Sequence, residues 1–295
     1  MSGRISWDDQ RAFLAVLEEG SLSGAARRLG VSHATVRSRV EALEGALGAA
    51  LFTRSVNGLT PTDAARALRD PARRMALASE QFVRQAAAPP GETAGIVRLS
   101  VPELMGIEVI PPMLAGLRAT HPAIRIELVL SNAPADLLSQ EVDVAVRTMA
   151  PGQGALVARK VAAIPLGLFA APAYLDRRGM PQTPDDLAAH DLIGPDRNRS
   201  DLALAERFGR ILHRDRLVIR TDSHPAQLAA ARAGLGIAVT QLPLGRRDPG
   251  LRHVLPDLVI ATLDTWIVTH ADLRRVPRVR AVFDMLAAAF AGARR

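Results

Sequence analysis

The sequence predicts an α/β protein that begins with a helical, winged helix-turn-helix domain. Three observations support this fold class. Residues 20–40 contain two short helical patterns that meet at a glycine, residues 65–86 carry an apolar heptad repeat, and strand and helix patterns alternate from residue 97 onward. A chain of 295 residues is also long enough to build two or more domains.

Composition excludes several classes of protein. The formal net charge is +7, which is compatible with a polyanionic partner but does not establish one. The absence of cysteine excludes disulfides and cysteinyl metal sites and suits a reducing compartment. Neither a secretory signal nor an apolar run of roughly 18 residues is apparent, so we expect a cytoplasmic protein with no membrane partner.

The first 50 residues show three helical patterns. Ser6 followed by Asp9 predicts the start of a first helix, which ends at Gly20. A second helix ends at Gly30, where glycine supplies the positive φ of a sharp turn, and Ser32 caps a third helix. The apolar faces of the second and third helices are formed by Ala25, Ala26, Leu29, Val36, Val40 and Leu43. This pattern predicts a helix-turn-helix whose second helix enters the major groove of double-stranded DNA.

Candidate DNA contacts lie on the third helix opposite its apolar face. His33, Ala34, Arg37 and Ser38 occupy its first two turns, where side chains reach base edges. Arg37 has the geometry to pair with guanine, worth roughly 1–3 kcal/mol of discrimination. An ordinary solvated helix face is the alternative interpretation. The full predicted set is Arg27, Arg28, Ser32, His33, Ala34, Thr35, Arg37, Ser38 and Arg54.

A wing and a long helix are predicted next. Asn57-Gly58 is a strong hairpin signal, and Thr60-Pro61-Thr62-Asp63 predicts a helix start with Thr60 as its cap. The heptad seam that follows predicts dimerisation through Leu68, Met75 and Phe82. Pro71 predicts a bend near residues 69–71, with Asp70 capping a restarted helix. Residues 88–91, Ala-Pro-Pro-Gly, read as a hinge.

The remaining residues alternate between strand and helix patterns. Strands are predicted at 97–101, 124–130, 142–146, 166–170, 217–221, 237–240 and 265–269. Helices are predicted after Pro111-Pro112 and at 184–189, 225–233 and 277–291. This alternation indicates an α/β domain with mostly parallel sheets.

These motifs together resemble the LysR-type transcriptional regulators. In the N-terminal part the matching residues are Phe13, Ala25-Ala26, Leu29, Val31-Ser32, Val36, Val40, Leu43-Glu44, Leu47-Gly48, Leu51-Phe52, Arg54 and Leu59-Thr60. In the remainder they are Arg98-Leu99, Ile110-Pro111-Pro112, His121-Pro122, residues 143–147, residues 171–175 and residues 233–237. The chain departs from the family's pattern at Ser32-His33-Ala34 and at Arg37-Ser38, so the family's usual base preferences do not transfer directly. Pro71 is unusual in the family's linker helix.

The resemblance implies a domain organisation and a set of partners. Residues 1–60 would form the winged helix-turn-helix and 61–90 the linker helix and hinge. Residues 91–295 would form an effector-binding domain like that of periplasmic binding proteins, with subdomain I at about 92–165 and 268–295, subdomain II at about 166–267, and a cleft between them. The expected partners are double-stranded DNA, a small-molecule effector, a second copy or three further copies of the chain, and RNA polymerase. No cofactor or metal is expected.

Candidate effector contacts follow the predicted strands, because ligands of open α/β sheets bind beyond the carboxyl ends of strands. They are Pro102, Glu103, Ser131, Asn132, Arg147, Asp222 and Ser223. This set favours a polar or anionic metabolite, with the guanidinium of Arg147 on its carboxylate. Two alternatives are ordinary loop chemistry and an internal pair between Arg147 and Glu103 or Asp143.

Two other functions compete with a ligand-responsive regulator. A solute-binding receptor would leave residues 1–88 unexplained. An enzyme with a DNA-binding appendage lacks supporting motifs, because Gly234-Leu235-Gly236 misses the third glycine of a dinucleotide fingerprint, no Gly-x-Ser-x-Gly elbow occurs, and the seven histidines show no metal-ligand spacing.

Overall fold

The computed structural model describes residues 5–55, 58–86, 93–132, 142–150, 156–206 and 214–292. The chain divides into two compact units, the first made mainly of Met1–Ala87 and the second beginning at Ala88. No helix of the described part is long and apolar enough to cross a membrane.

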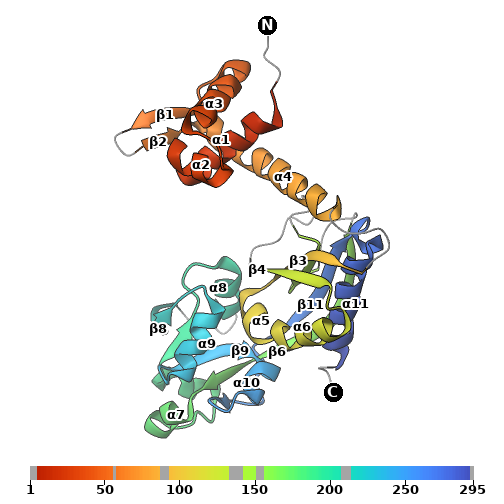
Figure 1. Cartoon of the computed structure of the whole chain (residues 1–295). Helices are drawn as coiled ribbons and strands as arrows, with labels where there is room; N and C mark the ends of the chain where they lie inside the picture. Colours follow the sequence, from red (N-terminus) through yellow and green to blue (C-terminus); the bar gives the residue numbers. More distant parts are fainter. Residues whose placement is uncertain are drawn as a thin grey trace. The chain divides into compact units, whose positions relative to one another are not determined.

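The first unit is a winged helix-turn-helix with a long helix attached (Figure 1). Its elements are α1 (Trp7–Glu19), α2 (Leu22–Leu29), α3 (His33–Leu47), β1 (Phe52–Ser55), β2 (Gly58–Pro61) and α4 (Asp63–Ala86). The Asp9 N–H donates to Ser6 Oγ and the Ser6 N–H donates to the Asp9 carboxylate, at 3.2 and 3.1 Å, so the predicted capping box is confirmed. Gly20 and Gly30 end their helices at φ values of 68° and 67°, as expected of C-cap glycines.

Small residues bring α1, α2 and α3 close together. Ala12, Ala25 and Val36 are completely buried in one cluster. The strands β1 and β2 pair antiparallel, which confirms the predicted wing, although Asn57 of its expected turn lies outside the described residues. The helix-turn-helix is therefore a rigid platform for the face of α3 opposite Val36.

Helix α4 differs from its prediction at two points. Thr60 and Pro61 belong to β2, and Thr62 provides the cap instead, because its Oγ1 accepts the Ala65 N–H at 3.2 Å. The helix also runs through Pro71 as one element, so the predicted restart at Asp70 is wrong. The predicted hinge at 88–91 lies outside the described residues.

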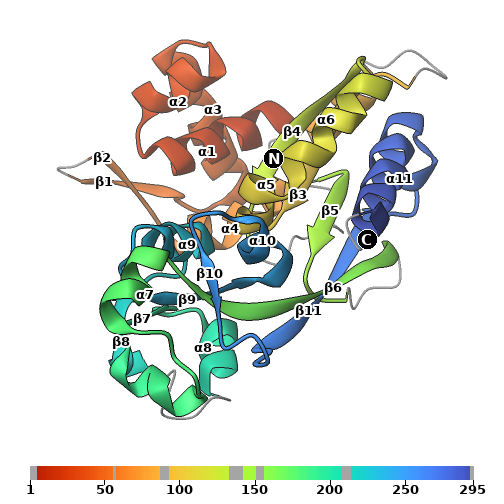
Figure 2. The ribbon, with the colours of Figure 1, turned by 90° about the horizontal axis from the view of Figure 1, so that it is seen from below.

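The second unit contains the elements from β3 onward (Figure 2). Its strands are β3 (Gly95–Val101), β4 (Ile124–Leu130), β5 (Val144–Arg147), β6 (Leu156–Ala170), β7 (Leu192–Gly194), β8 (Leu217–Arg220), β9 (Ile237–Gln241), β10 (Arg252–Val254) and β11 (Ala261–His270). Its α-helices are α5 (Glu103–Glu108), α6 (Ile110–Thr120), α7 (Pro172–Arg178), α8 (Arg199–Glu206), α9 (His224–Arg232), α10 (Leu242–Arg247) and α11 (Pro277–Gly292). The 3-10 helices are Pro184–Ala189, Arg214–Arg216 and Leu273–Arg275.

Within the described residues the nine strands form one sheet, in the order β4-β3-β5-β11-β6-β9-β7-β8, with β10 added to β6. Pairing is parallel among β4, β3 and β5 and among β9, β7 and β8, as the strand and helix alternation predicted. The long strands β6 and β11 run side by side and pair antiparallel (Figure 2). They therefore join the two parallel parts of the sheet.

Separate hydrophobic cores cover the two parallel parts. One core includes Val97, Ile164 and residues from α11, and another includes Leu166 and Leu192. The predicted subdomain boundary at 165/166 falls inside the continuous strand β6, and the boundary at 267/268 falls inside β11. The movement of two subdomains about these strands stays a prediction.

Candidate functional site

The predicted base-reading residues lie on the exposed face of α3. His33, Ala34, Arg37 and Ser38 are exposed, whereas Val36 is completely buried. This arrangement leaves the face free to enter a DNA groove, and the four residues remain predicted contacts.

Ser32 and Thr35 also serve the helix itself. Ser32 Oγ accepts the Thr35 N–H at 3.0 Å and lies 2.8 Å from Thr35 Oγ1. Both side chains thus complete the N-cap of α3, and any contact with DNA would be additional to this role.

The predicted phosphate-binding arginines differ in their surroundings. Arg27 and Arg28 are both exposed in the last turn of α2. The Arg28 guanidinium forms an ion pair with Glu18 and lies 3.5 Å from a carboxylate oxygen of Glu19. Arg54 is placed in β1, but its side chain lies outside the described part of the chain. Arg27 is thus the better placed of the α2 pair for a phosphate.

The dimerisation residues are not equivalent. Leu68 packs against the core formed by Phe13 and Leu43 of its own unit. Met75 is 43% exposed and Phe82 is 74% exposed. Part of the predicted seam therefore stabilises the N-terminal unit, which the heptad spacing did not distinguish from a dimer contact.

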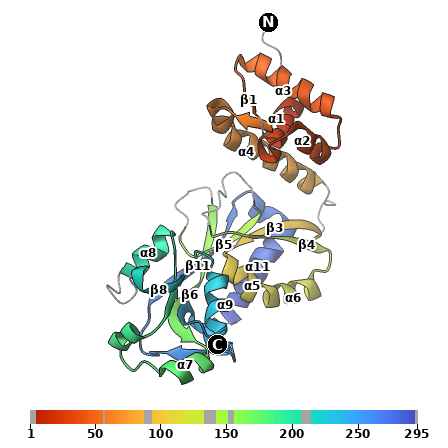
Figure 3. The same ribbon diagram turned by 90° about the vertical axis from the view of Figure 1, so that its left-hand side faces the viewer.

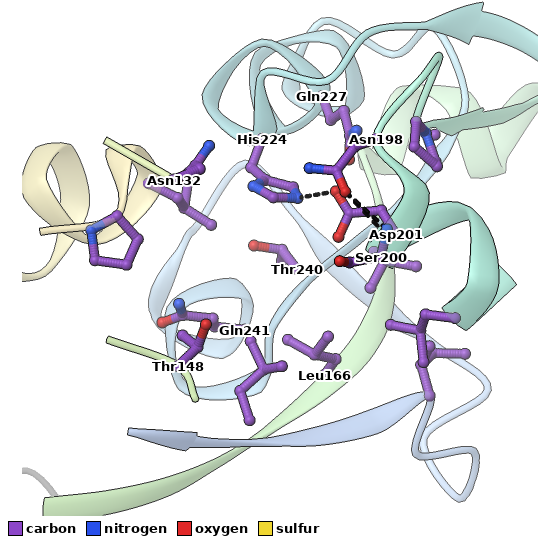
Figure 4. Close-up of a pocket in the computed structure, with 18 of the residues that line it drawn as sticks. Asn132, Thr148, Leu166, Asn198, Ser200, Asp201, His224, Gln227, Thr240 and Gln241 are labelled. Atoms are coloured by element: carbon purple, nitrogen blue, oxygen red, sulfur yellow. Dashed lines mark hydrogen bonds and ion pairs between the residues drawn. The ribbon is translucent and has the colours of Figure 1, made fainter. Parts of the chain in front are cut away.

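The second unit contains a cavity of about 250 Å³ (Figure 4). Its polar lining is formed by Ser131, Asn132, Arg147, Thr148, Asn198, Ser200, Asp201, His224, Gln227, Thr240 and Gln241. Its apolar lining includes Pro102, Leu104, Met105, Leu166, Ile193, Leu204, Leu217, Val239, Ile260 and Leu263. Pro102, Ser131, Asn132 and Arg147 were predicted from the sequence, and the structure brings them together.

Three predicted effector residues, Glu103, Asp222 and Ser223, are not among those that line the cavity. The Asp222 carboxylate instead accepts the backbone N–H groups of Asp196, Arg197 and Asn198, each at 2.9 Å. These hydrogen bonds lower the pKa of Asp222, and those from Asn198 and Arg197 have the largest effect. Asp222 therefore shapes the loop before α8.

Glu103 and Ser223 occupy helix starts. The Glu103 N–H donates to Asn132 Oδ1 at 3.1 Å, and Ser223 is the N-cap residue of α9 without a side-chain cap bond. Being adjacent to a lining residue does not place a side chain in the cavity, because successive residues at a strand or helix end point in different directions.

Arg147 is held by neutral acceptors. Its guanidinium donates to Ser100 Oγ at 2.7 Å, to the Ser100 carbonyl at 3.2 Å and to the Val146 carbonyl at 2.6 Å. Among the described residues Arg147 forms no ion pair with Glu103 or Asp143, and the Asp143 carboxylate accepts the Arg98 N–H at 2.8 Å. Burial without a carboxylate lowers the pKa of Arg147 to about 10, and its Nε has no partner in the described structure.

An ion pair that was not predicted crosses one side of the cavity. His224 Nε2 lies 3.0 Å from Asp201 Oδ2 and joins α9 to α8 (Figure 4). The hydrogen bond that His224 donates to the Asp201 carboxylate raises the pKa of His224, the charges of Asp201, Glu103 and Asp222 add to this effect, and burial opposes it. His224 directly follows the predicted Asp222-Ser223 pair, which was the available signal in the sequence.

Buried polar groups complete this side of the cavity. Thr240 is 3% exposed, and its Oγ1 has no partner among the described residues. Gln227 is held by a bond from its Nε2 to the Thr221 carbonyl at 2.6 Å. No three metal-ligating side chains are grouped in the described part of the chain.

Comparisons with known proteins agree with both units. Residues 7–66 match the model of the bacterial regulatory helix-turn-helix proteins of the lysR family, and residues 90–291 match the LysR substrate binding domain. A probable HTH-type transcriptional regulator, LtrA of Klebsiella pneumoniae, is 29% identical over 94% of this chain and 93% of its own length. An HTH-type transcriptional regulator of Xanthomonas campestris pv. campestris is 33% identical, and that match spans 65% of this chain and 56% of the relative.

A solved structure shares the fold. The full-length structure of CbnR complexed with its target DNA covers 96% of this chain and 99% of its own, with a TM-score of 0.70 and 20% sequence identity. The two domain matches together span nearly all of the chain. The chain therefore belongs to the LysR family, as a DNA-binding transcriptional regulator with an effector-binding domain and not an enzyme.

Proposed function

We propose that this regulator recognises its DNA site through His33, Ala34, Arg37 and Ser38 of α3 and changes its DNA binding when a small molecule occupies the cavity. The observation that carries the proposal is the exposed polar face of α3 opposite the buried Val36. Arg37 reads a base, while Arg27 and the wing residue Arg54 contact phosphates.

The effector is an anionic molecule of small size. Arg147 lines the cavity, and all of its hydrogen bonds go to uncharged oxygens. A partly buried cation without a counter-ion is destabilising, and a ligand carboxylate would compensate it. This assignment keeps Arg147 as the carboxylate partner but replaces Glu103, Asp222 and Ser223 with the lining residues Asp201, His224 and Thr240.

The chain acts as a homodimer or homotetramer. Phe82 and Val83 of α4 are 74% and 63% exposed, and Met75, one heptad before Phe82, is a further exposed apolar side chain. Association with a second copy would remove this surface from water. RNA polymerase is the partner through which a promoter-bound regulator would act.

A mobility-shift assay with the DNA upstream of the chain's own gene tests the proposal. We expect a specific complex whose affinity falls steeply between 50 and 200 mM salt, because phosphate contacts release counterions. The Arg37→Ala variant should weaken the specific complex more than binding to random DNA. Equal affinity of the wild-type protein for both DNAs would contradict the proposal.

A further inference from the structure

We propose that Glu44 is a positioning residue for DNA binding, because it fixes the wing formed by β1 and β2 relative to helix α3. This inference rests on the proposed function only in taking Arg54 of the wing as a phosphate contact. It adds that an acidic residue strengthens DNA binding by holding the backbone of the wing, although its own charge is repelled by phosphate.

The Glu44 carboxylate binds the chain where it enters the wing. Its Oε1 accepts the Leu51 N–H at 2.6 Å and the Phe52 N–H at 3.1 Å. Phe52 is the first residue of β1, and Glu44 lies in the last turn of α3. Hydrogen bonds to an ionised acceptor are roughly twice as strong as those between neutral groups. One side chain of α3 therefore holds two successive backbone groups at the entry to the wing.

The place of Glu44 in its helix supports this role. The C-terminal end of a helix carries a partial negative charge, so an acidic side chain in the last turn is unfavourable by itself. The last turn of α3 reads Glu44-Gly45-Ala46-Leu47 and contains no basic residue to offset that charge. The half-buried Glu44 carboxylate is compensated by the N–H groups of Leu51 and Phe52.

The wing needs support from outside its own strands. Each strand has four residues, and a two-stranded hairpin is marginally stable in water by itself. At the open end of the hairpin Phe52 pairs with Pro61, which has no N–H to donate. The Phe52 ring also packs against Phe13, with the ring centroids 5.7 Å apart. Apolar contacts are non-directional, whereas hydrogen bonds to consecutive N–H groups fix the direction of the strand.

Thr62 holds the same segment from the start of α4. Its Oγ1 donates to the Ala50 carbonyl at 2.9 Å, and its N–H donates to the Leu51 carbonyl at 2.9 Å. Glu44 thus binds the N–H groups of this segment, and Thr62 binds its carbonyl groups. Without Glu44 the wing would stay attached to α4 but would lose this connection to α3.

The test compares charge-matched variants of the full-length chain. Glu44→Ala removes both the charge and the hydrogen-bond acceptor, whereas Glu44→Gln removes the charge and keeps an oxygen acceptor. Glu41→Ala is the control, because Glu41 is an exposed acid of α3 that forms no hydrogen bond or ion pair within the described part of the chain. Fluorescence anisotropy with random-sequence duplex DNA across a salt series measures the affinities.

Electrostatics and positioning predict opposite signs for Glu44→Ala. Loss of an acid by itself favours binding to a polyanion, so Glu41→Ala and Glu44→Gln should bind DNA at least as tightly as the wild type. Glu44→Ala should instead bind about three- to tenfold more weakly, as expected when a phosphate contact is lost. The slope of log affinity against log salt should also fall by about 1.

A double-mutant cycle identifies the wing as the route of this effect. Arg54→Ala should weaken binding and reduce the salt slope as Glu44→Ala does. The double variant should bind no more weakly than either single variant, because both substitutions act through one contact. Circular dichroism confirms folding at the assay temperature. Glu44→Asp, whose shorter side chain draws the carboxylate back from the two N–H groups, provides the same test where Glu44→Ala is unfolded.

Three results would overturn the inference: a Glu44→Ala affinity equal to or above that of the wild type, a Glu44→Gln affinity as low as that of Glu44→Ala, or losses of Glu44→Ala and Arg54→Ala that add in full. Random-sequence DNA is used because phosphate contacts require no specific site. A wild type that binds its upstream DNA and random DNA equally would refute the proposed function, and the ranking of the Glu44 variants would still decide this inference.

Discussion

Leu104 and Met105 are adjacent residues of α5, yet their side chains pack in different hydrophobic cores. Met105 is completely buried in the core around Val97 and Ile110, whereas Leu104 is 8% exposed and packs with Phe169 and other residues of the opposite part of the sheet. Helix α5 lies between α6 and α9 (Figure 3). It is thus a third connection between the two parts of the effector-binding unit, in addition to β6 and β11.

An ion-pair network holds the end of this connection. The carboxylate of Glu108, the last residue of α5, accepts from Arg232 Nη1 at 2.7 Å, and Arg232 Nε donates to Asp248 at 2.6 Å. Arg247 donates to the Glu108 carbonyl. Pro102, Leu104 and Met105 also line the cavity. Helix α5 is therefore well placed to respond when a ligand occupies the cavity.

The first prediction concerns Leu104. Leu104→Ala should lower the free energy of unfolding of the effector-binding unit by about 2–5 kcal/mol, because it removes a buried side chain and leaves a void between two packed elements. Urea titration followed by circular dichroism measures the change. Ile107→Ala on the same helix is the control, because Ile107 is 50% exposed and its loss should be much smaller. Similar losses would show that α5 does not bridge the cores.

The second prediction compares two glycines. A Cβ at Gly106 would lie 2.1 Å from Leu130 Cδ2 and 2.7 Å from Val101 Cγ2, and Val101 is completely buried. Gly106→Ala should therefore destabilise the unit by about 1–3 kcal/mol. A Cβ at Gly116, on the exposed side of α6, would meet nothing within 4 Å. Gly116→Ala should stabilise by about 0.5–1 kcal/mol, and opposite signs in thermal unfolding are the expected result.

The third prediction separates two neighbouring arginines. Arg27→Ala should weaken binding to all DNA sequences and reduce the slope of log affinity against log salt by about 1. Arg28→Ala should have a smaller effect, because the Arg28 guanidinium already pairs with Glu18 and Glu19. Fluorescence anisotropy across a salt series measures both slopes. An equal reduction in the two variants would show that the ion pair opens on DNA.

The fourth prediction distinguishes two residues of α4 by their roles, one in folding and one in self-association. Leu68→Glu should lower the melting temperature of the N-terminal unit, since Leu68 packs against Phe13 and Leu43. Phe82→Glu should leave that temperature nearly unchanged and weaken self-association, because Phe82 is 74% exposed. Light scattering reports the association and calorimetry reports the melting. A Phe82→Glu variant with undiminished assembly would place the interface elsewhere.

The fifth prediction is a dependence on pH. The pKa of His224 is raised above 6.5 in the folded protein, first by its hydrogen bond with Asp201, and the charges of Glu103 and Asp222 act in the same direction. The stabilisation is therefore fully present below the ordinary pKa and lost as pH rises through the raised value. Relative to His224→Gln, the wild type should gain more stability at pH 5.5 than at pH 8.5. Urea titrations of both proteins at both pH values measure the free energies of unfolding. If the wild type and His224→Gln differ by the same amount at pH 5.5 and pH 8.5, the ion pair does not stabilise the folded protein in a pH-dependent way.

Local sequence patterns were sufficient for the elements of the N-terminal unit. Ser6, Gly20, Gly30 and Ser32 act within a few residues of their positions in the chain, through caps and left-handed turns, so their effect can be inferred without tertiary contacts. Strands β7 and β10 were missed, because runs of three residues are too short to show a periodicity.

The cavity shows the limit of the same approach. Strand ends correctly indicated Pro102, Ser131, Asn132 and Arg147, because parallel strands bring their carboxyl ends to one edge. The opposite wall comes from α8, α9 and β9, where Asp201 and His224 are 23 residues apart in the chain but 3.0 Å apart in space. No local pattern relates such positions.

The sequence by itself determined the family, the helix-turn-helix and the alternation of strands and helices, since these depend on short-range periodicity and on turn chemistry. Only the tertiary structure decided that Leu68 packs within its own unit, that Asp222 organises a loop, and that Leu104 and Met105 serve different cores. The physical reason is that apolar spacing identifies a buried face without identifying its partner. Likewise, a polar residue at a strand end acquires its role from the backbone groups that the fold brings to it.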